Sequence, residues 1–195
     1  MLPIAVYPRF PWLSRKALYI DIDIDNEDFL QLIERIGDRW MGIRENFADE
    51  EWKNLLRIPY AVSITVMAAA PSFLGAFSET KSMIIEPANL AASSGSGFLG
   101  LLSADMQSKT RDSIKEQQDL LMHDREGFRS KTIGACKSVT TTLSKTTPED
   151  AIAYKKWVLA IGQKVAEAAK EHGVALSEPE EAVLSEICAA IGISA

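Results

Sequence analysis

The sequence predicts an all-α fold, a bundle of about seven helices with an extended N-terminal arm. Two segments near the C-terminus repeat apolar residues every three or four positions, which is the spacing of a helix with one buried face. Residues that cap helices stand at the start of both segments. By contrast, one short segment near the N-terminus alternates in the manner of a β-strand. We therefore expect an extended arm over residues 1–25 and a single helical domain over residues 26–195.

The arm ends in the segment from Tyr19 to Asp25, where isoleucines alternate with aspartates. Such alternation is typical of a half-buried strand. The chain offers no second convincing strand pattern, so this segment either pairs with another molecule or extends as an arm. Because unpaired strands pair and swap between protomers, the pattern favours a homo-oligomer.

A capped helix follows the arm, and a second helix starts at Asp49 with acids in its first turn. This second helix leads into the uncharged segment Ile58–Phe77, which has the length of a membrane span. Prolines, serines, a glycine and many alanines make a membrane span unlikely there, whereas a helix that is apolar all round is typical of a protein core. We predict a buried central helix, with a bend at Pro59 and an end or kink at Pro71.

The middle of the chain contains a linker and two further helices. Residues 91–97 are rich in serine and glycine and mark the main loop. A long, polar helix over residues 98–123 follows, with a sparse apolar stripe. We expect the chain to turn or kink around Gly127, and an amphipathic helix to run from Phe128 to Leu143.

The last two helices have the clearest boundaries. Thr147 offers an N-cap, Pro148 lacks the N–H that would need a partner in the first turn, and Gly173 supplies a stop. Ser177 and Glu180 form the capping-box pattern of the final helix. The two apolar stripes consist of Tyr154, Trp157, Val158, Ile161, Val165 and Ala168, and of Val183, Leu184, Ile187, Cys188 and Ile191.

Composition restricts the class of partner and the compartment. The chain has 21 basic and 27 acidic residues and a net charge of −6, which argues against nucleic acid as a partner. Cys136 and Cys188 both fall on apolar stripes, as expected of reduced core residues in a cytoplasmic protein, although the sequence does not decide whether they form a disulfide. Prolines at positions 3, 8 and 11 interrupt any secretory signal.

Motifs that carry chemistry are incomplete. Residues 95–100 match the glycine pattern of dinucleotide-binding loops, but no strand pattern precedes them, so a linker that opens a helix is the preferred interpretation. The acids of residues 21–25 resemble the start of a calcium loop that lacks its glycine and its glutamate. His123 has no recognisable nucleophile partner. We expect no catalytic residue and no cofactor, although catalytic groups need not be neighbours in sequence.

The region around residue 173 has the form of a helical repeat unit. Residues 165–173 are the end of a helix with a small-residue turn, and residues 177–181 start a capped helix with an early glutamate. In this pattern the chain resembles the tellurite-resistance TerB-like helical domains, although His172 stands where that family usually carries aspartate. The resemblance implies an all-α fold and a divalent-metal site. Its candidate ligands are Glu167, Glu171, His172, Glu178, Glu180 and Glu181.

Three hypotheses of function result. The first is a non-enzymatic interaction or scaffolding module, assembled through the arm as a homo-oligomer or with another protein. The second is a TerB-like divalent-metal-binding domain. The third is peripheral association with a membrane, for which a few bases give weak attraction, about 1 kcal/mol each near an anionic surface. The residues of this third hypothesis are Arg9, Phe10, Trp12, Arg15 and Lys16.

Overall fold

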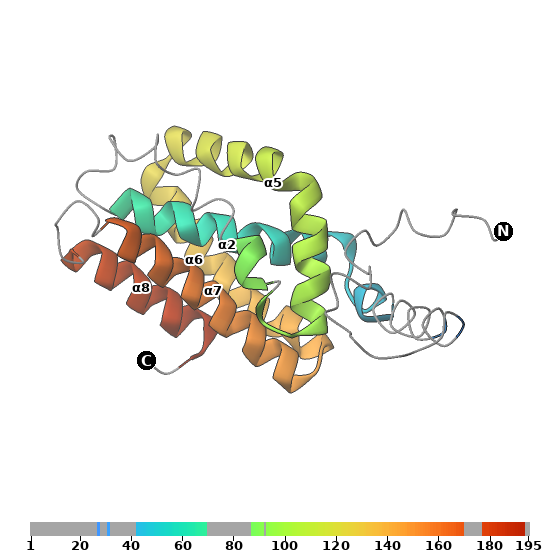
Figure 1. The fold of residues 1–195 in the computed structure, drawn as a ribbon. Coiled ribbons are helices and arrows are strands. Elements are labelled where there is room, and N and C mark those ends of the chain that lie inside the picture. The colour runs from blue at the N-terminus through green and yellow to red at the C-terminus, as the bar shows by residue number, and fades with distance from the viewer. Residues whose placement is uncertain are drawn as a thin grey trace. The chain divides into compact units, whose positions relative to one another are not determined.

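The computed structural model describes residues 42–69, 87–91, 93–169 and 177–193, together with Glu27 and Gln31. The chain divides into two compact units, Met1–Gly42 and Ile43–Ala195. The described residues contain no strand, so the prediction of an all-α bundle is confirmed. The predicted arm, with its segment Tyr19–Asp25, lies outside the described residues. In the second unit, the helices whose bounds the structure gives are α2 (Asp49–Ala69), α5 (Gly97–His123), α6 (Arg125–Thr142), the short 3-10 helix η2 (Leu143–Lys145), α7 (Pro148–Ala169) and α8 (Glu178–Ile191) (Figure 1).

Helix α2 is the central helix of the bundle. It packs against α5, α6, α7 and α8 (Figure 1), and every residue from Ile58 to Ala68 is buried. A helix with neighbours on all sides buries all of its faces, which explains why this segment has no charged residue. The prediction of a buried central helix is therefore confirmed for these residues, whereas residues 70–77 lie outside the described part. No described helix combines the length and the apolar character that a membrane span requires.

Two buried threonines form a polar contact between α2 and α6. Thr65 Oγ1 donates to the carbonyl of Ala61 at 2.7 Å, and Thr132 Oγ1 donates to the carbonyl of Phe128 at 3.0 Å. The two hydroxyl oxygens lie 3.1 Å apart. A hydroxyl that bonds the carbonyl four residues earlier is satisfied within its own helix, so both threonines are compatible with the core.

A proline inside α2 leaves one buried carbonyl without its helical donor. Pro59 has no N–H and so cannot bond the carbonyl of Leu55, four residues earlier. The hydroxyl of Tyr154, on α7, donates to this carbonyl at 2.9 Å. Because burial raises the pKa of Tyr154 well above 10.0, the hydroxyl keeps the proton that it donates. A side chain of one helix thus completes the backbone hydrogen bonding of another.

Aromatic side chains join α2, α5 and α7 around Tyr154. Phe98 packs between Trp52 and Tyr154, with ring centroids 6.1 Å and 6.3 Å apart. The rings of Tyr154 and Trp157 are 5.5 Å apart, and Trp157 Nε1 donates to the carbonyl of Pro87 at 2.9 Å. Tyr154 and Trp157 are buried, as their place in the predicted apolar stripe required.

The starts of α5 and α7 share one carboxylate. The N–H of Asp150 donates to Thr147 Oγ1 at 3.2 Å, which confirms the predicted N-cap of α7. Ser96 caps α5 by accepting the N–H of Leu99 at 3.2 Å, and its hydroxyl donates to the Asp150 carboxylate at 2.7 Å. Asp150 therefore places a negative charge near two helix N-termini, where it is favourable.

The turn between α5 and α6 lies at Asp124 rather than at Gly127. Helix α5 ends at His123, and the Asp124 carboxylate accepts the N–H of Gly127 at 2.8 Å. Gly127 itself is part of α6. A Cβ atom on Gly127 would lie 1.9 Å from Asp124 Oδ2, so the absence of a side chain at this position leaves room for the cap.

Replacing Tyr154 by Phe should lower the free energy of unfolding by about 1–3 kcal/mol, because the Leu55 carbonyl would stay buried without a donor. The matched control is Ser63→Ala, which also removes a buried hydroxyl from the core. Ser63 bonds the carbonyl of Pro59, which keeps its helical N–H donor in the variant. Urea unfolding followed by circular dichroism measures both variants, and equally small losses would contradict the role of Tyr154.

Candidate functional site

The predicted metal ligands have different environments in the structure. Glu167 is exposed on α7, where it forms an ion pair within the helix. Glu178 and Glu181 are exposed in the first turn of α8. Glu171 and His172 lie outside the described residues. In the part of the chain that the structure describes, no group of three His, Cys, Asp or Glu residues could hold a metal ion.

Glu180 is the one buried residue among the four described candidates, with 3% of its surface exposed. Its carboxylate accepts the N–H of Ser177 at 2.9 Å and the Ser177 hydroxyl at 2.6 Å. This geometry confirms the predicted capping box and gives Glu180 a structural role at the start of α8. The metal-binding hypothesis therefore stays a prediction, and it depends on residues 170–176, outside the described part.

The glycine pattern at residues 95–100 forms the start of α5. Gly95 has a φ of +70°, Ser96 is the N-cap, and the residues described just before them are helical or in a turn. A dinucleotide-binding loop needs a strand in that position. Gly95 and Ser96 thus precede a helix, as predicted, whereas Ala91 and Ser93, inside the predicted main loop of residues 91–97, are helical. His123, at the end of α5, is exposed, and the carboxylate of its neighbour Asp124 is engaged in the cap of α6.

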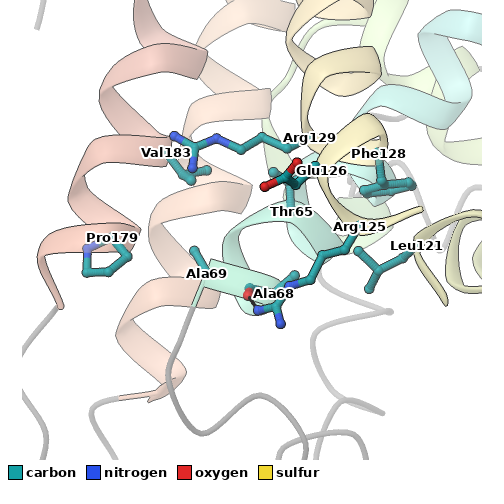
Figure 2. Close-up of a pocket in the computed structure, with 10 residues that line it drawn as sticks. All are labelled: Thr65, Ala68, Ala69, Leu121, Arg125, Glu126, Phe128, Arg129, Pro179 and Val183. Atoms are coloured by element: carbon teal, nitrogen blue, oxygen red, sulfur yellow. Dashed lines mark hydrogen bonds between the residues drawn. The ribbon is translucent and has the colours of Figure 1, made fainter. Parts of the chain in front are cut away.

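A cavity of about 330 Å³ lies between the end of α2 and the starts of α6 and α8 (Figure 2). Its volume is at the lower end of the range for small-molecule sites. Figure 2 shows side chains of these three helices around it, together with Leu121 near the end of α5. Its apolar lining consists of Ala68, Ala69, Leu121, Phe128, Pro179 and Val183.

Both arginines that line the cavity have partners. Arg125 donates from Nη2 to the carbonyl of Ala68 near the end of α2, where a cation is favourable. Arg129 forms two hydrogen bonds to Glu186, 2.8 Å from Nη2 and 3.2 Å from Nε. The described lining holds one carboxylate, Glu126, and no histidine or cysteine, so it supplies no acid–base or nucleophile pair.

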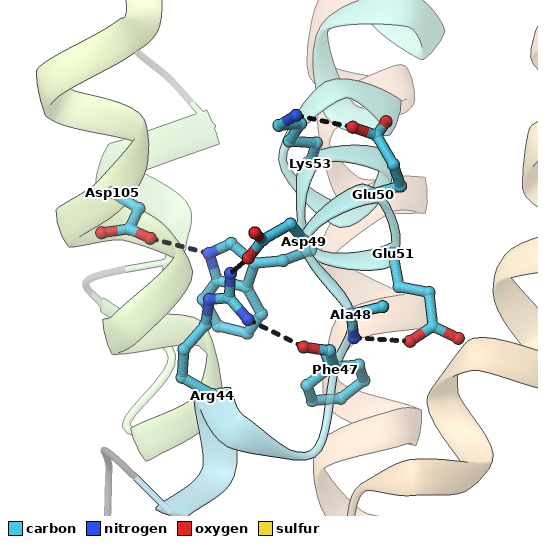
Figure 3. Close-up of polar contacts among 9 residues, drawn as sticks. Arg44, Phe47, Ala48, Asp49, Glu50, Glu51, Lys53 and Asp105 are labelled. Atoms are coloured by element: carbon cyan, nitrogen blue, oxygen red, sulfur yellow. Dashed lines mark hydrogen bonds and ion pairs between the residues drawn. The ribbon is translucent and has the colours of Figure 1, made fainter.

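Arg44 fixes the chain just before it enters α2 (Figure 3). Its guanidinium lies 5.1 Å from the centroid of the Trp52 ring and donates to the carbonyl of Phe47 at 2.8 Å. It also pairs with the carboxylate of Asp49. Trp52 Nε1 in turn donates to Asp105 Oδ2, on α5, at 2.7 Å. No sequence pattern indicated this anchor, because Trp52 and Asp105 are 53 residues apart.

Both cysteines are free thiols, so the disulfide that the sequence left undecided does not form. Cys136 is fully buried in the core. Cys188 is half-buried, and its thiol lies 3.2 Å from the carbonyl of Ile193.

The chain matches no protein-family model, no curated protein and no solved structure. The resemblance to TerB-like domains is therefore neither supported nor refuted.

The two thiols should differ in reactivity at pH 9. Burial raises the pKa of Cys136 from 9.0 to about 12, so its thiol stays protonated in the folded protein while an unfolded chain ionises it. We expect a thiolate-specific reagent to label Cys188 first and Cys136 only as the protein opens. The same shift predicts that the contribution of Cys136 to stability is complete below about pH 9 and is lost as the pH rises toward 12. Fast labelling of Cys136 in a folded Cys188→Ala variant would contradict this prediction.

Proposed function

We propose that the chain is a non-enzymatic interaction or scaffolding module that self-associates through its N-terminal arm, residues 1–25. The observation that carries the proposal is the strand-like alternation of Tyr19–Asp25 in a chain whose described part is entirely helical outside its turns. A strand pattern has no partner strand among these described residues, so a second copy of the arm is the most direct partner.

The start of the second unit is held in place by contacts with its core, which supports the proposal. The chain divides after Gly42, and the residues that follow belong to the bundle. Arg44 and Phe47 tie this entry point to Trp52, whose ring lies 5.7 Å from that of Phe47. The first residues of the second unit are therefore anchored in its core.

Charge makes the proposed pairing sensitive to salt. Any pairing of two arms that keeps their isoleucines on one face brings the aspartates of both copies together on the other face. Like charges opposite each other weaken a strand pair, and the net charge of −6 adds to the repulsion between copies. Added salt screens this repulsion, so the assembly should strengthen as ionic strength rises.

Substitutions on the two faces of the arm test the proposal. Ile22→Lys places a charge on the apolar face and should reduce the assembly to the 21.5 kDa monomer. Asp23→Asn is the matched control on the opposite face, and it should preserve or strengthen the assembly because it removes repulsion. Native mass spectrometry of untagged, full-length protein gives the masses.

A wild-type chain that is monomeric at every salt concentration would contradict arm-mediated association. The same conclusion would follow if Ile22→Lys left the mass of the assembly unchanged. A monomer that carries the additional mass of a specific divalent ion would instead favour the metal-binding hypothesis.

A further inference from the structure

One non-helical residue joins α5 to α6. Asp124, with φ −154° and ψ 92°, is the C-cap of α5 and the N-cap of α6. Its N–H donates to the carbonyl of Leu120 at 3.1 Å, and its carboxylate accepts the N–H of Gly127 at 2.8 Å. The change of direction between the two helices therefore depends on the conformation of a single residue.

The sequence around this joint is compatible with an uninterrupted helix. If Asp124 took helical dihedral angles, the N–H groups of residues 125–127 would bond the carbonyls of residues 121–123. In the turn, the N–H of Gly127 bonds the Asp124 carboxylate instead of the carbonyl of residue 123. Most neighbouring residues, among them leucine, methionine, arginine and glutamate, are good helix formers. The cap at Asp124, the space that Gly127 leaves for it and the packing between the two parts of the bundle together hold the turn.

The joint divides the core into two complementary halves. The half before Asp124 contributes α2 and α5, and the half after it contributes α6, α7 and α8. Helix α2 packs against all three helices of the second half, so the core lies between the halves. A second copy of the chain offers the same complementary surfaces. A short hinge between two extensively packed halves is the arrangement from which domain swapping starts.

We propose that two copies of this chain form a domain-swapped dimer in which α5 and α6 become one helix through Asp124. The α2–α5 half of each copy then packs on the α6–α8 half of its partner and recovers the core contacts of the monomer. This association uses a hinge inside the bundle and not the arm of residues 1–25, so it does not rest on the function proposed above.

Two substitutions favour the straight joint. Asp124→Ala removes the cap and introduces the best helix former, and Gly127→Ala places a Cβ atom where the Asp124 carboxylate lies. After refolding from denaturant at high protein concentration, both full-length variants should form more dimer, at twice the 21.5 kDa of a single chain, than the wild type does in native mass spectrometry. Thr147→Ala is the matched control, because it removes a cap from α7 without affecting the joint. Its mass should equal that of the wild type.

A cross-link at an ion pair between the two halves can distinguish a swapped dimer from other dimers. Lys145 Nζ lies 2.6 Å from Glu51 Oε2, so a carbodiimide can link these side chains as an amide. When isotope-labelled and unlabelled chains of one variant are refolded together, swapped dimers give Glu51–Lys145 peptides that combine both isotopes. Lys164 and Glu167, whose charged groups are 3.6 Å apart, belong to the same half and give single-isotope peptides in every case.

Mixed-isotope Glu51–Lys145 peptides from the dimer would support the swap. Dimers that give only single-isotope peptides would show that each bundle stays intact on association, which is what pairing through the arms requires. That result would overturn the swap and leave the arm proposal standing. Variants at Asp124 and Gly127 that both remain monomeric at high concentration would also overturn it.

Discussion

The hydrogen bond from the Tyr154 hydroxyl to the Leu55 carbonyl determines how the core is assembled. Helix α2 is surrounded by other helices, so each polar group of its backbone needs a partner within the protein. Pro59 removes one of these partners, and a side chain of a neighbouring helix replaces it. Because Tyr154 comes from α7, this bond joins α7 to α2 at the level of Leu55. Phe98 and Trp157 then pack on the same ring.

Carboxylates organise the helix ends of the bundle. Asp124 joins α5 to α6, Asp150 ties the starts of α5 and α7, and Glu180 caps α8. Glu180, one of the candidate metal ligands, has this structural role, and among the described residues no group of three His, Cys, Asp or Glu side chains could hold a metal ion. Association is proposed at two separate places in the chain, the arm of residues 1–25 and the hinge at Asp124.

The sequence predicts those features that depend on neighbouring residues. Helical periodicity places the apolar stripes, and local capping patterns place the starts of α7 and α8. The sequence predicts the turn at Gly127 and not at Asp124, because glycine is the stronger local signal for a turn. In the structure, Gly127 instead donates its N–H to the Asp124 cap. The contacts of Trp52 with Asp105 and of Tyr154 with Leu55 join residues far apart in the chain, so no periodicity or motif predicts them.

A double-mutant cycle of Pro59→Ala and Tyr154→Phe tests the central claim most directly. Alanine at position 59 restores the N–H that a regular helix directs to the Leu55 carbonyl. Tyr154→Phe should therefore cost less stability in the Pro59→Ala background than in the wild type, with a coupling energy of about 0.5–3 kcal/mol in urea unfolding. An equal loss of stability in both backgrounds would contradict the account, because Tyr154 would then act independently of the carbonyl that Pro59 leaves unpaired.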